Sequence, residues 1–494
     1  MFDRVDDPHR GATRSGGVGL VGLGVMGRGL AMNLAGHGHR VVGFDTAVDR
    51  AVRSGDGLTS PDSPVERVGS LPDLASRLSR PRRVLVMVPA GDPVDAVLAD
   101  LAAVLDAGDV VIEGGNSHPR DTARRADALG AAGIHLVGAG ISGGESGARS
   151  GPSIMVGADA AGWALAGELL TAIAAVDPDG NPCCDRIGPG GAGHLTKMIH
   201  NGIEYALMQA ISEVVMLLRA DGASAVDAAA VLRGWQGSPV DGYLLRIMTD
   251  VLLTRDSDGS ALVDAVLDAA AMKGTGSWTV ALSLDLGHPT PLITSAVQAR
   301  SLSARLDERR AFQDAVDAAP FDPDDRRANV GAEDLRSALV GAMVVAFSEG
   351  LDLLDTAAQA EGWTVDLARV AQLWRAGSII ETQLLEHIIE ARRERTPLRS
   401  LLVTPQMTAL LGSVTAGLRR TILAATVRGL PVPALAAALG TVDGMRTVPG
   451  TGSLIQAMRD RFGAHTYERH DRPRGERFHS AWEGGSERST EETT

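Results

Sequence analysis

Two lysines are the residues of this chain best suited to proton-transfer chemistry. Of its 47 lysine and arginine residues, only Lys197 and Lys273 are lysine, so arginine occupies almost every other cationic position. Surface charges and ion pairs tolerate that exchange, but a general base does not, because a guanidinium stays protonated whereas burial can tune an ammonium group. Either the two lysines persist by chance, or these two positions require an amine.

Lys197 belongs to a stretch, 193–219, that is apolar around most of its circumference and is therefore predicted to be a buried helix. At about 100° per residue, four polar side chains of this stretch share one side of the helix within about 100° of arc: Lys197, His200, Asn201 and Glu204. We call these four residues the polar stripe. Buried polar groups need partners, so the stripe is either an internal hydrogen-bond network or a site. An amine and a carboxylate two turns apart suit proton transfer at opposite ends of a small substrate.

A weak internal repeat favours a site. An offset of 139 residues aligns Trp235 (GWQGS) with Trp374 (LWRAGS) and superposes two long apolar helices that begin near Gly193 and Ala332, which predicts two packed copies of a helical bundle. At this offset the positions that match the polar stripe are Arg336, Leu339, Val340 and Met343. Because the second copy is mostly apolar there, the bundle does not require the stripe.

A glycine-rich turn near the N-terminus predicts a dinucleotide site. Residues 22–27 read G-x-G-x-x-G, after a predicted strand at 17–22 and before a predicted helix at 26–36. These glycines allow a tight turn and close approach of a pyrophosphate to the helix N-terminus. A second strand at 40–44 leads to Asp45, where an acid can hold the ribose hydroxyls. A turn without a ligand is the alternative.

The pattern of elements predicts a doubly wound α/β domain followed by helices. Further strands are expected at 83–88, 109–113 and 134–138, with helices around 94–105 and 120–132, which implies a parallel sheet of the Rossmann type. From 193 onward the periodicity is helical. The predicted segments are a disordered extension at 1–16, a dinucleotide-binding domain at 17–190, a duplicated all-helical domain at 191–447, and a C-terminal tail at 448–494 whose end, GGSERSTEETT, is expected to be disordered.

Composition excludes several classes of protein. Hydrophobic residues make up 44% and charged residues 22% of the 494 residues, which is typical of globular chains. The net charge of −14 argues against nucleic-acid binding. Cys183 and Cys184 are the only cysteines, so neither a disulfide framework nor a metal knuckle is expected. No run of eighteen apolar residues and no secretory signal is visible, so we expect a soluble, cytoplasmic protein that does not bind membranes.

Six longer motifs resemble those of the 6-phosphogluconate dehydrogenase family. They are GLGVMGRGLAMNLAGHG (22–38), EGGNSHPRDTARR (113–125), GAGISGGESGARSGPSIMVG (138–157), GAGHLTKMIHNGIEYALMQ (191–209), KGTGSWT (273–279) and LIQAMRDRFGAHTYE (454–468). Shorter β-hydroxyacid dehydrogenases share the first half of the chain but lack the second repeat and the tail. The resemblance implies a Rossmann domain, a duplicated helical domain and a homodimer in which each tail reaches into the partner subunit.

The reaction implied by this resemblance is oxidative decarboxylation of 6-phospho-D-gluconate to D-ribulose 5-phosphate and carbon dioxide, with NAD or NADP and no metal. Lys197 would be the general base and Glu204 the general acid. Residues matching the family's sugar-acid positions are Asn116, Ser142, Gly143, Gly144, His200 and Asn201. Residues matching its phosphate site are Tyr205, Lys273, Thr275 and Arg300, joined by Arg459 and His465 of the tail. The expected cofactor-binding residues are Gly22, Gly24, Val25, Met26, Gly27, Asp45, Thr46, Val88 and Asn116.

The chain departs from the family pattern after the second strand. The usual Asn-Arg-Thr reads Asp45-Thr46-Ala47, and a basic residue usual after the third cofactor strand is Pro89. A carboxylate would repel a 2′-phosphate, so NAD is the expected cofactor, although Arg50 and Arg53 lie close enough in sequence to oppose this. The segment ahead of the tail, 442–453, is also altered. Two alternative functions remain: a dehydrogenase of another anionic aldonate, and a catalytically silent NAD-binding regulator.

Overall fold

The computed structural model describes residues 17–46, 63–317, 330–393 and 400–482. The expectations for 1–16, Arg50, Arg53 and the last twelve residues lie outside this range. The chain divides into two compact units, Met1–Leu439 and Gly440–Thr494, which we describe separately.

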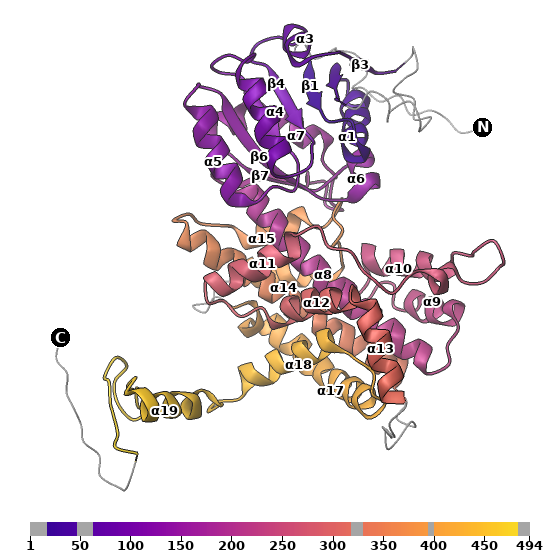
Figure 1. Ribbon diagram of the computed structural model, residues 1–494, viewed down its shortest axis with the longest axis vertical. Coiled ribbons are helices and arrows are strands. Elements are labelled where there is room, and N and C mark those ends of the chain that lie inside the picture. The colour runs from indigo at the N-terminus through magenta and orange to yellow at the C-terminus, as the bar shows by residue number, and fades with distance from the viewer. Residues whose placement is uncertain (1–16, 47–62, 318–329, 394–399, 483–494) are drawn as a thin grey trace. The chain divides into compact units, whose positions relative to one another are not determined.

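The first unit begins with an eight-stranded sheet in the order β3-β2-β1-β4-β5-β6-β7-β8, at the top of Figure 1. The strands are β1 (Val18–Val21), β2 (Val41–Phe44), β3 (Val65–Arg67), β4 (Arg83–Val86), β5 (Val110–Glu113), β6 (His135–Ile141), β7 (Ile154–Gly157) and β8 (Cys184–Gly188). The order reverses between β1 and β4, and in such sheets ligands bind at the carboxyl ends of the strands beside this point.

Helices cover both faces of the sheet, which confirms the doubly wound α/β prediction. The helices of this region are α1 (Val25–Gly36), α3 (Leu71–Ser76), α4 (Asp92–Ala102), α5 (Pro119–Gly130), α6 (Gly144–Ser150) and α7 (Ala160–Ile173). Buried residues of α1 and α7 pack on one face of the sheet, and those of α3, α4 and α5 pack on the other. Because both faces are covered, the central strands are continuous apolar runs.

The prediction of an entirely parallel sheet is wrong for one pair of strands. β6 and β7 are antiparallel, whereas the other six pairs are parallel. A parallel connection needs a crossover of a dozen or more residues that covers a sheet face. The connection between β6 and β7 has only twelve residues and contains the seven-residue α6, which is at the lower limit of such a crossover, and the chain turns back instead. The short strands β3, β7 and β8 were not predicted.

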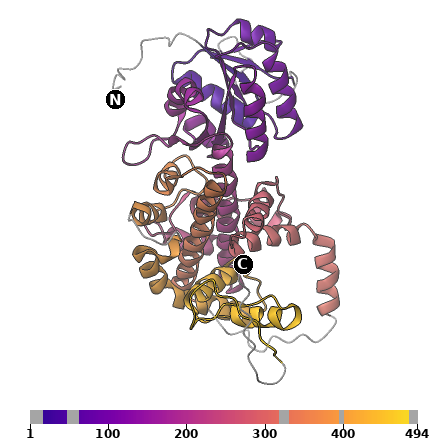
Figure 2. The same cartoon turned by 90° about the vertical axis from the view of Figure 1, so that its left-hand side faces the viewer.

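The remainder of the first unit is helical, as expected. Its helices are α8 (Ala192–Ala220), α9 (Ala225–Arg233), α10 (Tyr243–Leu253), α11 (Thr275–Asp285), α12 (Pro291–Ser303), α13 (Leu306–Asp317), α14 (Ala332–Ala360), α15 (Leu367–Leu373), α16 (Leu384–Arg393), α17 (Pro405–Val427) and α18 (Pro433–Arg446). Figures 1 and 2 show α8 running from beneath the sheet into the middle of these helices. Among the described residues, α14 has the length and apolarity of a membrane span, but 89% of its most apolar window is buried inside the structure, as in the core helix of a bundle.

The internal repeat is visible as paired contacts. α8 and α14 are both 29 residues long and pack together at the centre. Gly242, just before α10, forms an antiparallel bridge with Thr382, just before α16. Around it, Tyr243 N donates to the Glu381 carbonyl and Gln383 N donates to the Asp241 carbonyl. The corresponding segments of the two copies therefore pair with each other, as around a local two-fold axis.

The second unit contains the end of α18 and the helix α19 (Gly452–Gly463), followed by an irregular segment that folds back on it. The carboxylate of Asp460, which is fully buried, accepts hydrogen bonds from Thr466 N, His479 Nδ1, Ser480 N and Trp482 Nε1. These bonds lower the pKa of Asp460 to about 2 although burial opposes them. One ionised carboxylate thus organises the folded part of the tail.

Candidate active site

The polar stripe lies on the buried helix α8, as the sequence predicts. Lys197, His200 and Asn201 are each less than 10% exposed, and the Glu204 side chain is 23% exposed. Lys197 Nζ lies 3.4 Å from His200 Nδ1, and Asn201 Oδ1 lies 3.2 Å from the same nitrogen. Glu204 Oε2 is 3.9 Å from His200 Nδ1. The four side chains therefore form one connected cluster around His200.

Burial sets the protonation of this cluster. It lowers the pKa of Lys197 to about 8, with the nearby Glu204 opposing the shift. It also raises the pKa of Glu204, while Lys197 and Arg300 pull in the opposite direction. Burial and the adjacent Lys197 hold the pKa of His200 well below its ordinary value, so His200 is neutral. An amine that titrates near neutral pH can act as a base, and a carboxyl with a raised pKa can act as an acid.

The turn at the end of β6 faces the stripe and is held by a segment from the second repeat. His200 Nε2 lies 2.9 Å from Ser142 Oγ and 2.8 Å from Ser378 Oγ, and Ile379 N donates to Ser142 Oγ. A side chain on Gly143 would clash with the Gly377 carbonyl, which explains glycine at this close approach. The His200 ring also contacts the fully buried Trp374 edge-on, with 5.7 Å between ring centres.

Gly377 and Ser378 are site residues that sequence reasoning missed. The LWRAGS motif that contains Ser378 served only to align the repeat. The sequence signal that could have identified it is the recurrence of Gly-Ser after both aligned tryptophans. Ser238 follows Trp235 by three residues, one fewer than separate Ser378 from Trp374, and it donates to the Trp235 carbonyl instead.

Among the expected phosphate residues, Tyr205 directly follows Glu204 on α8, and the others come from α12 and from the start of α11. The Arg300 guanidinium lies 3.6 Å from the centre of the Tyr205 ring. Thr275 is buried at the first turn of α11, and the adjacent Gly276 packs against Tyr205. Lys273 is exposed just before that helix. Arg300 therefore lies beside Tyr205 and close enough to Glu204 to influence its charge. Lys273 and Thr275 belong to the segment that packs against Tyr205 through Gly276, so a cation and hydroxyls are available for an anionic group.

The carboxyl ends of β1 and β2, with the turn at residues 22–27 and Asp45, form an edge of the sheet that we call the cofactor edge. It has the geometry that a pyrophosphate needs. Gly22 has φ +95°, and a side chain on Gly27 would clash with the Gly22 carbonyl. A Cβ on Gly24 would meet nothing within 4 Å, so the N-terminus of α1 is open to a ligand. Leu23 N donates to Asp45 Oδ2 at 2.6 Å, which fixes the carboxylate at the end of β2. The neighbouring Val25, Met26 and Thr46 occupy this same edge, and Val88 packs against Gly22.

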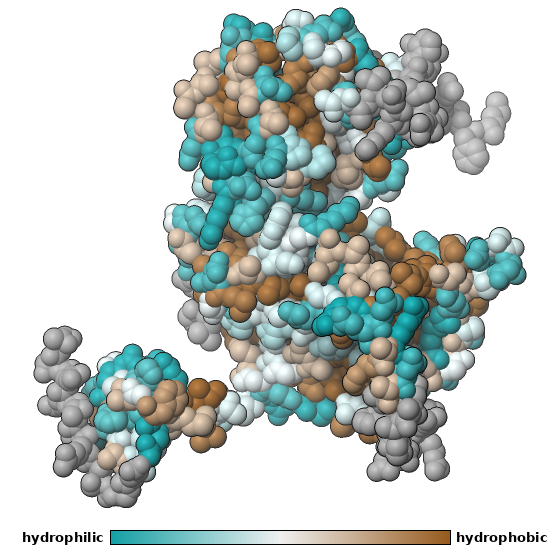
Figure 3. Space-filling view, viewed as in Figure 1, coloured by the Kyte–Doolittle hydropathy of each residue, from teal (hydrophilic) through white to brown (hydrophobic). Residues whose placement is uncertain are grey.

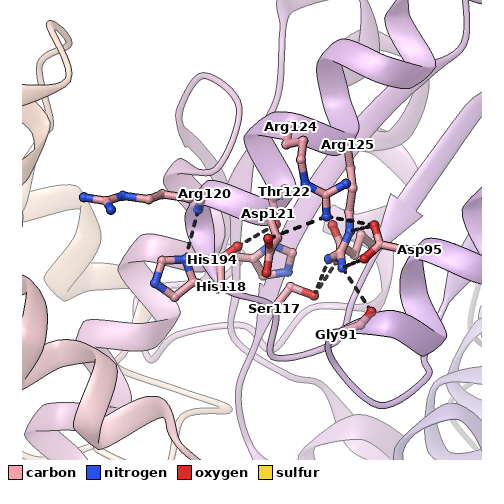
Figure 4. Close-up of polar contacts among 11 residues, drawn as sticks. Gly91, Asp95, Ser117, His118, Arg120, Asp121, Thr122, Arg124, Arg125 and His194 are labelled. Carbon is pink, nitrogen blue, oxygen red and sulfur yellow. Dashed lines mark hydrogen bonds and ion pairs between the residues drawn. The ribbon is translucent and has the colours of Figure 1, made fainter.

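Asn116 is exposed in the turn after β5, which a buried arginine holds in place (Figure 4). Arg125 is 2% exposed and donates to Glu113 at 2.7 Å, to Ser117, to Asp95 of α4 and to the Gly91 carbonyl. Ser117 also donates to Glu113. One guanidinium thus joins the turn around Asn116 to the loop before α4.

Arg459 and His465 lie in the second unit. Arg459 donates to Gln456 Oε1, and the His465 ring contacts Phe462 edge-on. His465 and Thr466 lie in the segment that Asp460 organises. In the described part of the chain, no group of three or more His, Cys, Asp or Glu side chains could hold a metal ion. Both cysteines are buried and free.

Two family models match the chain. The model described as the NAD binding domain of 6-phosphogluconate dehydrogenase matches residues 17–188, and that of the 6-phosphogluconate dehydrogenase C-terminal domain matches residues 193–482. The boundary between them falls just before α8.

Full-length relatives agree with these matches. The decarboxylating 6-phosphogluconate dehydrogenase of Treponema pallidum is 43% identical over 479 residues, covering 94% of this chain and 97% of the relative. The NAD(+)-dependent enzyme of Bacillus subtilis is 39% identical, covering 94% and 99%. A structure of the Plasmodium falciparum enzyme, from a study of its apo form and its complexes with NADP+ and with 6-phosphogluconate, matches with a TM-score of 0.87 at 30% identity, covering 94% of this chain and all of that one.

Proposed function

The chain belongs to the 6-phosphogluconate dehydrogenase family, and from that premise we propose that it converts 6-phospho-D-gluconate into D-ribulose 5-phosphate and carbon dioxide. The observation that supports this most strongly is the polar stripe. A buried lysine and a partly buried glutamate lie two turns apart on one helix, with perturbed pKa values in the directions that a base and an acid need.

Lys197 is the proposed base of the oxidation. Its neutral amine takes the proton of the C3 hydroxyl while hydride leaves C3, so C3 is oxidised to a ketone and Lys197 becomes an ammonium. NAD or NADP supplies the hydride acceptor when bound at the cofactor edge. Neutral His200, between the two serine hydroxyls and Lys197 Nζ, orients the amine.

The same lysine assists the loss of carbon dioxide. The Lys197 ammonium donates to the 3-keto oxygen, which takes up negative charge as the C1 carboxylate departs. The enediol that results is protonated on the terminal carbon by Glu204, whose raised pKa keeps a proton available. The two groups act at opposite ends of the reacting segment, consistent with their separation along α8.

Substrate orientation follows from what surrounds the stripe. Asn116, Ser142, Gly143, Gly144 and Asn201 would hold the sugar acid, and Tyr205, Lys273, Thr275 and Arg300 would hold the phosphate. In a protein with a net charge of −14, these local cations are what attract a dianionic group.

We propose that the active form is a homodimer whose tails are exchanged. Arg459 and His465 of the partner's tail would complete the phosphate site. Leu454, Ile455, Met458 and Phe462 of α19 are all more than half exposed, as on a surface that another chain covers. Apolar residues also gather over α10 in the first unit (Figure 3), where Ile247 and Val251 are exposed one turn apart.

NAD is the proposed cofactor. Asp45, held by Leu23 N, would accept a hydrogen bond from a free ribose hydroxyl and repel a 2′-phosphate. We expect kcat/KM to favour NAD over NADP by about tenfold or more, equivalent to about 1.4 kcal/mol. In Asp45→Asn the preference should shrink, because the repulsion is gone.

One assay tests the proposed function. Purified protein is mixed with 6-phosphogluconate and either NAD or NADP, and reduced nicotinamide and carbon dioxide are measured together. Equal amounts of the two products are expected, with NAD the better cofactor, and sedimentation should give twice the mass of the chain. Reduced cofactor without carbon dioxide, or activity only with a different aldonate, would contradict the proposal.

A further inference from the structure

A separate cavity lies on the side of α8 that faces away from the polar stripe. Its volume is about 320 Å³, within the range of ~300–1,000 Å³ typical of small-molecule sites. Leu195 and Met198 of α8 line it, whereas Lys197 between them points to the catalytic side. Its other walls come from the start of α5, the segment before α8, α11 and the end of α14. It shares no residue with the proposed substrate or cofactor positions.

The walls of the cavity are suited to a flat apolar body. The indoles of Trp278 and Trp363 line it, together with the imidazole of His118, which contacts Trp278 edge-on at 5.2 Å between ring centres. Burial lowers the pKa of His118, so this ring is neutral. Five of the lining positions are alanine, whose small side chains leave room beside the rings: Ala123, Ala192, Ala281, Ala357 and Ala360. Aromatic faces and small side chains together favour an aromatic ring.

The charges of the cavity are divided between its two sides. Arg120 comes from α5, and Figure 4 shows its side chain extending away from the cluster around Arg125. Asp285, the last residue of α11, and Glu361, which follows α14, come from the helical side. In the described ranges, none of these three side chains has a charged or hydrogen-bonding partner.

The partial charges of the helix ends at the cavity have the same signs as the charged side chains on each side. α5 and α8 begin at the cavity, whereas α11 and α14 end there. Helix N-termini favour negative charge and C-termini favour positive charge. A purely anionic ligand would face two carboxylates, and a purely cationic one would face Arg120. The arrangement favours a molecule with opposite charges at its two ends.

We propose that this cavity binds a small aromatic zwitterion, whose carboxylate pairs with Arg120 and whose ammonium group pairs with Asp285 and Glu361. The flat ring lies between Trp278 and Trp363. This site is distinct from the proposed active site, and its existence does not depend on the proposed reaction.

The test compares three probes on the full-length protein by calorimetry: 4-(aminomethyl)benzoate, benzoate and benzylamine. The zwitterion should bind at least about tenfold more tightly than either singly charged probe. Arg120→Gln should remove its advantage over benzylamine, and Glu361→Gln should reduce its advantage over benzoate. Equal affinities for the three probes, or no binding of the zwitterion to the wild-type protein, would overturn the proposal.

Filling the cavity provides a second, steric test. Ala360→Trp should abolish binding of the zwitterion, and Ala281→Trp serves as an independent variant if the first does not fold. Thermal melting, rather than enzyme activity, verifies folding, so the result stands whether or not the proposed reaction is correct. An unchanged dissociation constant in a folded Ala360→Trp or Ala281→Trp protein would place the zwitterion elsewhere.

Discussion

The two central helices α8 and α14 have the same length and nearly the same burial, yet only one contains a polar stripe. His200 and Asn201 on α8 are buried and Glu204 is 23% exposed, whereas the aligned Leu339, Val340 and Met343 on α14 are buried and apolar. Since α14 packs without polar groups at these positions, the stripe on α8 is not needed for folding. Buried polar groups that the fold does not need indicate function.

Each of the two helices also has a buried glutamate with a structural purpose, although the two glutamates do not align at the 139-residue offset. Glu213 of α8 accepts hydrogen bonds from Ala434 N and Leu435 N at the start of α18. Glu349 of α14 accepts them from Leu292 N and Ile293 N at the start of α12. Each carboxyl accepts hydrogen bonds from the first turn of a helix of the other repeat, so these two buried glutamates have a role in the fold.

The largest expected effect is on kcat, and it distinguishes a substitution of Lys197 from one of its aligned counterpart Arg336. Lys197→Arg keeps the positive charge but removes a group that can lose its proton near neutral pH. We expect kcat to fall by about 10³-fold or more. The mirror substitution, Arg336→Lys, should change kcat less than about twofold, because in the described part of the chain that side chain forms an ion pair with Glu333 alone, on the helix surface. Steady-state assays of both variants measure the difference, and substantial activity in Lys197→Arg would refute the assignment of the base.

Exchanging the residue types at one aligned position, Asn201 on α8 and Val340 on α14, should lower stability in the α14 variant and activity in the α8 variant. Val340→Asn places an amide at a position that is only 3% exposed and should lower the free energy of unfolding by about 2–3 kcal/mol while kcat is retained. Asn201→Val should leave stability unchanged or higher but reduce kcat/KM for the substrate at least about tenfold. Urea unfolding and initial rates give both quantities. Equal losses of stability in the two variants would mean that the stripe is structural.

A smaller effect, on the pH dependence of stability, concerns Glu349, the carboxyl of α14 that caps α12. Burial raises the pKa of Glu349 to about 8, against two backbone hydrogen bonds. A carboxyl with a raised folded-state pKa stabilises the protein fully below its unfolded pKa, about 4.5, and this contribution is lost as pH rises through 8. Glu349→Gln cannot titrate. Between pH 5 and 8, its free energy of unfolding should therefore fall by about 1–3 kcal/mol less than that of the wild type.

Urea unfolding across that pH range measures the decline. Glu333→Gln, on the exposed face of α14, is the control and should keep the wild-type slope. Parallel profiles for the wild type and Glu349→Gln would show that Glu349 does not titrate in this range. Turnover should be unaffected in both variants.

The sequence predicts those site residues that lie close together along the chain. It misses those that come together only when distant segments fold against each other. The G-x-G-x-x-G turn, Asp45 and the four residues of α8 follow from spacing along one element. Ser378 does not, because its contact with His200 joins residues 178 apart in the chain. The antiparallel direction of β7 was missed for a similar reason: it is set by pairing with β6, which the sequence of the strand itself does not show. The placement of Arg459 and His465 against a partner remains a prediction.

The pH dependence of kcat/KM for 6-phosphogluconate tests most directly whether the stripe of α8 supplies the base. Because kcat/KM reports ionisation of the free enzyme, it should rise about tenfold per pH unit on the acid side and level off above a midpoint near 8, the pKa that burial gives Lys197. A midpoint near 6.5 would assign the base to a histidine, and a flat profile would exclude an ionising base, so either result would contradict the role of Lys197.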